Sequence, residues 1–328
     1  MRTSSTLALG AALALSAAAC SRRGEDPARP LRLGYFPNVT HAQALVGLDD
    51  GTFARALGGR VDPRMFNAGP AAMEALLAGD LDASYVGPGP AAIAFLRSRG
   101  EGLRVVAGAA SGGAVLVVRD ASGPRDLAGK RVASPQLGNT QDVALRTWLR
   151  ANGLGTDGGD AGVQVTPLAN ADILSMFARG ELAGAWVPEP WGARLVAEAG
   201  GRILVDEASL WEEGKFPTAV LVVSRSALER RRADVAALVR AHVELTRRWA
   251  ADRDRFAALS NEAYGRRTGK PLPDAVLRDA LSRVTPTSDP LRAPLAKMAR
   301  DAQALGYAPP GDLSAMVDGS LLAEVARR

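Results

Sequence analysis

Gly79-Asp80-Leu81-Asp82-Ala83-Ser84-Tyr85-Val86-Gly87 is echoed 101 positions later by Gly180-Glu181-Leu182-Ala183-Gly184-Ala185-Trp186-Val187-Pro188. Both copies place a glycine after a stretch of helical periodicity, then an acid and a leucine, and then an apolar segment that ends in an aromatic residue and a valine. A glycine that ends a helix just before a buried strand is the signature of a helix-to-strand connection. The recurrence predicts two similar α/β lobes.

The segments around each copy alternate between short apolar runs and helical periodicity. The expected strands are 31–36, 61–66, 83–86 and 104–107 in the first unit, and 130–134, 163–167, 184–187 and 202–205 in the second. The expected helices are 41–57, 71–77 and 90–98, then 140–152, 171–178 and one from about 191. Strand–helix–strand order of this kind predicts an α/β fold with mostly parallel sheets.

Two strongly apolar runs, Ala114–Val118 and Ala219–Val223, bracket the second unit and are predicted to be the crossings between the lobes. From about Ser226 the chain is predicted to be helical and to return to the first lobe. Its apolar positions form one face, made of Val235, Leu238, Val239, His242, Leu245, Thr246 and Trp249. We therefore expect lobe 1 to comprise 31–115 and 222–328, and lobe 2 to comprise 116–221.

Composition excludes several classes of protein. The chain has 328 residues, 47% of them hydrophobic and 23% charged, which is typical of a globular protein and not of a disordered chain or a disulfide scaffold. The formal net charge of +5 comes from scattered arginines, with only four lysines, and the longest basic run is Arg230-Arg231-Arg232. Without a basic stripe interleaved with aromatic residues, no nucleic-acid partner is expected.

The N-terminus reads as an export signal. Leu7 to Ala19 is an apolar run of 13 residues, too short to span a bilayer but suited to a signal peptide. It ends at Ala17-Ala18-Ala19-Cys20, and Cys20 is the only cysteine of the chain. Residues 1–19 are predicted to be a signal peptide, Cys20 the lipidated first residue, and 20–30 a tether on the outer side of a bacterial membrane. The alternative is a plain secretory signal followed by an incidental cysteine.

Four segments together resemble a known family. They are Gly34-Tyr35-Phe36-Pro37-Asn38-Val39-Thr40-His41-Ala42, the stretch from Gly79 to Pro90, Asp126-Leu127-Ala128-Gly129-Lys130-Arg131-Val132-Ala133, and Trp186-Val187-Pro188-Glu189-Pro190-Trp191. In this order they resemble the periplasmic substrate-binding lipoproteins of ABC importers, in the nitrate, sulfonate, taurine and thiamine-precursor group. The resemblance implies a two-lobe type II binding-protein fold that clamps a small anion between its lobes. It also implies a permease and an ATPase as partners, with the binding protein acting as a monomer.

Five loops follow predicted strands or precede a crossing, and parallel α/β sheets bind ligands at the carboxyl ends of their strands. The candidate ligand-binding residues in these loops are Asn38, Thr40, His41, Gly87, Pro88, Gly89, Ser111, Gln136, Asn139, Thr140, Gln141, Glu189 and Trp191. Helix N-termini there would favour an anion, and His41 is the one candidate able to carry a positive charge.

Each candidate also has a structural interpretation. Asn38 and Thr40 are residue types that cap helices, Gly87–Pro90 could be pure turn chemistry, and Trp191 could be an ordinary core aromatic. Asp142 is expected to interact with the start of its helix, and His242 to be structural because its neighbours are apolar.

The function predicted from these features is capture of a small organic anion, an aliphatic or aryl sulfonate or a sulfate ester, for an ABC importer. Nitrate and a thiamine-like pyrimidine are the alternatives, the pyrimidine stacking on aromatic residues and using Glu189. No HExxH, GxSxG, Walker or CxxC pattern occurs in the chain, so neither an enzyme nor a cofactor or metal site is expected. A lipoprotein that acts only through contact with a partner protein is a third possibility.

Overall fold

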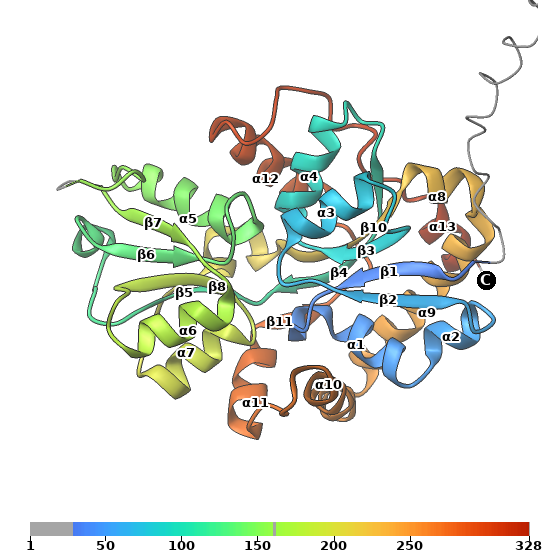
Figure 1. The fold of residues 1–328 in the computed structure, drawn as a ribbon, viewed down its shortest axis with the longest axis horizontal. Coiled ribbons are helices and arrows are strands. Elements are labelled where there is room, and N and C mark those ends of the chain that lie inside the picture. The colour runs from blue at the N-terminus through green and yellow to red at the C-terminus, as the bar shows by residue number, and fades with distance from the viewer. Residues whose placement is uncertain (1–28, 160–161, 328) are drawn as a thin grey trace, which may run out of the picture.

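The computed structural model of the chain describes residues 29–159 and 162–327. The predicted signal peptide, Cys20 and the tether as far as residue 28 lie outside the described residues. The chain forms two sheets, one of six strands and one of five, each covered by helices on both faces (Figure 1). We call the six-stranded sheet with its helices lobe 1, and the five-stranded sheet with its helices lobe 2.

Lobe 1 is built from both ends of the described chain. Its sheet has the strand order β11-β4-β10-β3-β1-β2. These strands are β1 (Leu31–Tyr35), β2 (Val61–Met65), β3 (Ala83–Val86), β4 (Leu103–Gly112), β10 (Pro217–Ser224) and β11 (Val284–Pro286). Its helices are η1 (Val39–His41), α1 (Ala42–Asp49), α2 (Thr52–Ala56), α3 (Gly69–Leu77), α4 (Pro88–Arg97), α8 (Arg225–Arg230), α9 (Arg232–Ala251), α10 (Arg253–Thr268), α11 (Asp274–Ser282), α12 (Arg292–Ala304) and α13 (Ser320–Ala326).

Lobe 2 is formed by one continuous segment, and its sheet has the strand order β7-β6-β8-β5-β9. These strands are β5 (Ala114–Val118), β6 (Arg131–Ser134), β7 (Gln164–Pro167), β8 (Gly184–Pro188) and β9 (Arg202–Asp206). The helices are η2 (Pro124–Leu127), α5 (Thr140–Ala151), α6 (Asn170–Ala178), α7 (Trp191–Ala199), η3 (Glu207–Leu210) and η4 (Glu212–Gly214). In Figure 1, α5 covers one face of this sheet and α6 and α7 cover the other.

The prediction of mostly parallel sheets is wrong in one respect, because both sheets are mixed. The pairs β1–β2, β1–β3, β6–β7 and β6–β8 are parallel. The pairs β10–β3, β10–β4, β11–β4, β5–β8 and β5–β9 are antiparallel. The two apolar runs at the lobe junctions form β5 and β10, and each enters its sheet against the direction of its neighbours.

The positions of the crossings also differ from the expectation. Ala114–Val118 and Ala219–Val223 both lie entirely inside strands, so neither is a free connection. The chain instead leaves lobe 1 at Gly112 and Gly113, both of which have positive φ. It returns through residues 207–216, which hold η3 and η4. The predicted lobe boundaries at 115 and 222 thus fall within β5 and β10.

The sequence repeat corresponds to equivalent parts of the two lobes. Gly79 and Gly180 end α3 and α6 with φ of 85° and 78°, a left-handed conformation that glycine adopts without a steric cost. The strands β3 and β8 follow these glycines, and each lies within its sheet beside a parallel neighbour. The prediction of two similar α/β units is confirmed in this respect.

The helix expected over 41–57 is divided into η1, α1 and α2. The division lies at Asp50, whose carboxylate accepts hydrogen bonds from the backbone nitrogen and the hydroxyl of Thr52 at 2.9 and 2.6 Å. An aspartate that binds the first residues of the following helix ends one helix and begins another.

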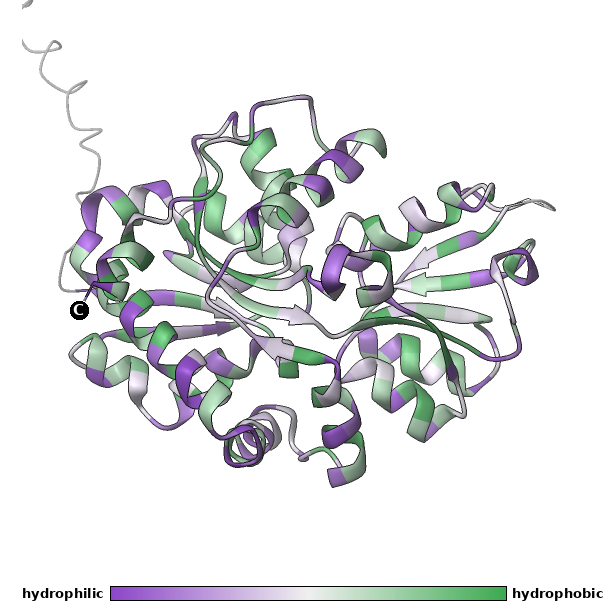
Figure 2. Cartoon of the chain, turned by 180° about the vertical axis from the view of Figure 1, so that it is seen from behind, coloured by the Kyte–Doolittle hydropathy of each residue, from purple (hydrophilic) through white to green (hydrophobic). Residues whose placement is uncertain are grey.

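Apolar residues form separate cores on the two faces of each sheet. Stripes of apolar residues run along the helices of both lobes and alternate with hydrophilic ones (Figure 2). All of the positions predicted for the apolar face around Val235–Trp249 are buried in α9, and α9 packs on lobe 1, as predicted. Within residues 29–159 and 162–327, no helix is both long enough and apolar enough to cross a membrane.

Candidate functional site

A cavity of about 30 Å³ lies between the lobes, where the parallel strands of both sheets end. The chain contributes to it directly after β1, β2 and β3 of lobe 1 and at or after the ends of β6, β7 and β8 of lobe 2. The lining residues are Phe36, Asn38, Thr40, His41, Asn67, Ala68, Gly69, Gly87, Pro90, Pro135, Asn139, Thr140, Gln141, Asn170, Pro188 and Thr218. This is the position at which parallel α/β sheets bind ligands.

The cavity brings together loops that the sequence analysis had singled out. Seven of the candidate residues line it, namely Asn38, Thr40, His41, Gly87, Asn139, Thr140 and Gln141. Six candidates do not line it, namely Pro88, Gly89, Ser111, Gln136, Glu189 and Trp191. The lining side chains from residues 38–41 and from residues 139–141, at the start of α5, are all at least 94% buried.

Asn38 does not cap the helix that follows it, although its residue type favours that role. Its Oδ1 instead accepts a hydrogen bond from Nε1 of Trp191, at 3.2 Å across the two lobes. Trp191 is therefore oriented toward Asn38 and packs its ring under the guanidinium of Arg194, 4.7 Å from the ring centre. Its contact with the site is indirect.

His41 is a neutral donor and not the cation that we expected. Burial lowers the pKa of His41 to about 3, because the charged ring would lose its hydration. Its Nδ1 accepts a hydrogen bond from the backbone nitrogen of Phe36 at 3.2 Å, and its ring stacks on Phe36 with centroids 4.5 Å apart. The single ring proton therefore lies on Nε2, which is left to donate to a ligand.

The residues at the start of α5 cap this helix and also contact lobe 1. Asn139 caps α5, accepting from the backbone nitrogen of Asp142 at 2.8 Å, so its side-chain nitrogen is the group left for a ligand. Thr140 Oγ1 accepts a hydrogen bond from the backbone nitrogen of Gly89 at 3.2 Å, which joins the lobes. Asp142 is buried in the first turn, where it binds Ser134, Arg146 and, from lobe 1, the hydroxyl of Tyr307.

Glu189 is directed away from the cavity. It is fully buried, and its carboxylate pairs with Nε of Arg283 at 2.7 Å and accepts from the backbone nitrogen of Ala193 at 3.0 Å. Ser111 likewise has a structural partner, since its hydroxyl accepts from the backbone nitrogen of Phe216 at 3.3 Å. These partners explain why both candidates lie outside the lining.

Three polar lining residues, Asn67, Asn170 and Thr218, were not among the candidates. Asn67 follows β2 and Asn170 follows β7, so the rule used for Asn38 would have found them if it had been applied to every predicted strand. Asn170 Oδ1 is buried without a hydrogen-bond partner among the described residues. A buried, unpaired acceptor at a cavity wall is a group that a ligand or a water can satisfy.

The lining provides positive potential without a formal charge. Among the described residues that line the cavity there is no aspartate, glutamate, lysine or arginine. The first turns of α3, α4, α5 and α6 nevertheless begin at Gly69, Pro88, Thr140 and Asn170, in or next to the lining. Helix N-termini carry about half a positive charge each and expose unpaired N–H groups, which favours an anion.

His242 is structural, as predicted. It is fully buried in α9 and lies outside the lining, with Nδ1 hydrogen-bonded to the hydroxyl of Tyr85 at 2.9 Å. Burial lowers its pKa to about 4, so this ring is neutral as well.

Comparison with known proteins identifies the family of the chain. The chain is 29% identical over 215 residues to the taurine-binding periplasmic protein of Escherichia coli K12, a match that covers 64% of each chain. The chain thus spans less than two thirds of that relative's length. The present chain has the same fold as the alkanesulfonate-binding protein SsuA of Xanthomonas axonopodis pv. citri bound to MOPS. The TM-score is 0.69 at 23% identity, and the match covers 91% of this chain and 98% of SsuA.

The periplasmic nitrate-binding protein NrtA of Synechocystis PCC 6803 has the same fold, at a TM-score of 0.77, 14% identity and coverage of 91% of this chain and 88% of NrtA. Residues 24–261 match the NMT1-like family, more than half of the chain. The protein therefore belongs to the NMT1-like family.

Proposed function

We propose that the protein captures a small organic anion, a sulfonate or a sulfate ester, outside the cytoplasm and delivers it to an ABC importer. The observation that carries this proposal is the cavity between two lobes, lined by neutral donors and helix N-termini. Such a site stabilises a single negative charge without a fixed cation, which keeps binding reversible. The taurine-binding relative and the alkanesulfonate-binding structural neighbour support this ligand class.

A binding role is favoured over catalysis by the chemistry of the lining. The described lining residues include no carboxylate, cysteine or lysine that could serve as an acid, a nucleophile or a Schiff base. Delivery to an importer implies a permease and an ATPase as partners.

Nitrate is the second candidate, because a cavity of about 30 Å³ leaves little room beyond an anionic head group. The pyrimidine alternative has less support. It depended on Glu189, and the carboxylate of this residue is engaged by Arg283.

A thermal-shift screen of the purified protein against alkyl- and arylsulfonates, sulfate esters, nitrate and pyrimidines tests the proposal. A ligand at about 1,000 times its Kd stabilises the folded state by roughly 4 kcal/mol, which is readily detected. A shift with sulfonates or sulfate esters is expected. A shift with nitrate alone, or with none of the panel, would contradict the proposal, and the latter would favour a lipoprotein that acts through partner contacts.

Thr140→Ala and His41→Ala are each expected to weaken binding of the best sulfonate by ten- to a hundredfold. Each substitution removes one buried donor to an anion, and such a hydrogen bond contributes roughly 1.5–3 kcal/mol. His242→Ala is the control, because it removes the other buried histidine and leaves the lining intact. Titration calorimetry on the three variants is the measurement. Unchanged affinity in both cavity variants would place the anion elsewhere.

We further propose that Cys20 carries a lipid that anchors the protein to the outer side of a membrane. Cys20→Ser should release the protein from the membrane fraction, because multiple acyl chains anchor stably whereas the tether offers no other apolar segment. Fractionation followed by immunoblotting measures the change. A serine variant that still sediments with membranes would refute the lipid anchor.

A further inference from the structure

The carboxylates next to the cavity are already neutralised by the protein. Glu189 and Asp142 directly follow the lining residues Pro188 and Gln141 in the sequence, and both are fully buried. Glu189 is held by Arg283, and Asp142 by Arg146 at 3.1 Å, Ser134 at 2.7 Å and Tyr307 at 2.8 Å. No carboxylate is therefore left among the described lining residues to pair with a cation on the ligand.

A groove next to the cavity is uncharged as well. A groove of about 480 Å³ shares Asn67, Ala68 and Pro135 with the cavity and is otherwise lined by β2, the first turn of α3 and the ends of β6 and β7. Its described lining residues are apolar apart from Asn67 and Gln136, and Met65 and Leu168 are among them. A second hollow, which Glu74 and Arg97 line together, shares only Pro90 with the cavity.

We propose that the site selects anions that carry no ammonium group and rejects zwitterionic sulfonates; this rests on the proposed function. A sulfonate gains from the N-termini of α3 to α6, whereas an ammonium two carbons away meets the same positive potential. An ammonium that is buried without a carboxylate loses its hydration, and a neutral amide oxygen such as Oδ1 of Asn170 offsets only part of that loss. The organic tail of a bound sulfonate, with any ammonium on it, would have to lie in the cavity or in the uncharged groove.

Ethanesulfonate and taurine test this inference, because they differ only in the ammonium group. By titration calorimetry on the purified protein at neutral pH, ethanesulfonate is expected to bind about a hundredfold more tightly than taurine. Equal or tighter binding of taurine would overturn the inference and leave the sulfonate function standing. Failure of both compounds, and of every other sulfonate and sulfate ester, to bind would overturn the proposed function and the inference with it.

Asn170→Asp should abolish the preference. Asn170 lines the cavity at the first position of α6, and its Oδ1 is buried with no hydrogen-bond partner among the described residues, so the variant puts a carboxylate where an ammonium could be met. An aspartate in the first turn of a helix is favourable, so the fold should be kept. We expect affinity for ethanesulfonate to fall about tenfold and affinity for taurine to rise about tenfold.

Gln164→Glu provides the matched control. It adds the same charge to lobe 2 at the exposed first residue of β7, outside the cavity and the groove. The ratio of the two affinities should stay at the wild-type value in this control. An unchanged ratio in Asn170→Asp, or an equal change in both variants, would show that carboxylates at the cavity do not set the preference.

Discussion

Gly87→Val is expected to weaken sulfonate binding by about a hundredfold, because a side chain at this position holds the lobes apart. A Cβ atom at Gly87 would lie 2.3 Å from Oγ1 of Thr140, far closer than two such atoms can approach. The same approach recurs at Gly89, where a Cβ would lie 3.0 Å from the Cα atom of Thr140. The two glycines of lobe 1 therefore permit the contact with α5 that closes the cavity.

The expected loss of affinity follows from the hydrogen bonds that the ligand loses when the lobes are held apart. An anion in the open protein keeps donors from one lobe only, and losing about two charge-assisted hydrogen bonds costs roughly 3 kcal/mol or more. The variant should still fold, since Gly87 has φ of −66° and ψ of 148°, which any residue adopts. The collision exists only between the lobes.

Titration calorimetry with the best sulfonate measures the loss, and small-angle scattering of the variant and the wild type with ligand shows whether the variant is the more open of the two. Gly123→Val is the control, because Gly123 has an extended backbone and a Cβ there would meet nothing within 4 Å. Affinity in Gly87→Val within threefold of wild type would mean that closure of this contact is not needed for binding.

Most of the fold could be predicted because its signals are local. The glycine-ended helices before β3 and β8, and the periodicity of α9, depend on residues close together in the chain. Strand direction is different: the apolar runs of β5 and β10 indicate burial, but an apolar run reads the same whether its neighbours are parallel or antiparallel. The sequence could therefore show these strands but not the mixed sheets.

The candidate site, too, could be predicted from the sequence only in part. Loops that follow predicted strands could be located, and seven of their residues line the cavity. Glu189 could not be excluded from the sequence, because the residue that neutralises it, Arg283, lies 94 positions further along the chain. The charge of His41 could not be predicted from the sequence either, because burial in the fold lowers its pKa.

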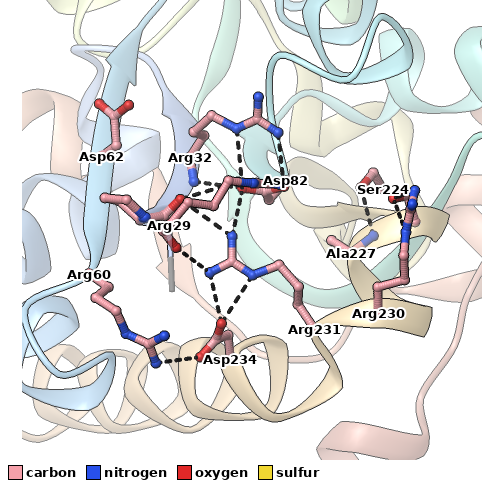
Figure 3. A network of polar contacts seen from close by, with 12 residues as sticks. Arg29, Arg32, Arg60, Asp62, Asp82, Ser224, Ala227, Arg230, Arg231 and Asp234 are labelled. Atoms are coloured by element: carbon pink, nitrogen blue, oxygen red, sulfur yellow. Dashed lines mark hydrogen bonds and ion pairs between the residues drawn. The ribbon is translucent and has the colours of Figure 1, made fainter. Parts of the chain in front are cut away.

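Away from the cavity, lobe 1 contains a buried charge network at the edge where the parallel strands begin. Asp82 is 2% exposed and accepts from Arg29 at 2.6 and 2.7 Å, from the backbone and side chain of Arg32, and from Arg231 at 3.3 Å (Figure 3). Arg231 also pairs with Asp234 and donates to the backbone oxygens of Arg29 and Pro30. Asp82 thus connects the start of the described chain, the end of α3 and the start of α9.

Because of this network, the free energy of unfolding depends on pH in the acid range. Burial alone would raise the pKa of Asp82, but hydrogen bonds from Arg29 and Arg32 outweigh it and lower the pKa from 3.8 to about 2. Because the pKa is lower in the folded state, the contribution to stability is complete above about pH 4 and is lost as the pH falls through about 2. Its size is about 2 kcal/mol.

Asp82→Ala is expected to lower the free energy of unfolding by about 3–5 kcal/mol, because it leaves the buried guanidinium of Arg231 without one of its two carboxylates. Urea unfolding monitored by circular dichroism measures the change, and the variant should also lack the acid-dependent step between about pH 4 and 2. Asp62→Ala is the matched control: Asp62 pairs with Arg64 on β2, where the two side chains are 34% and 57% exposed, and such pairs contribute about 0–1 kcal/mol. Equal losses in the two variants would mean that the Asp82 network behaves as a surface ion pair, and that burial adds nothing to its effect.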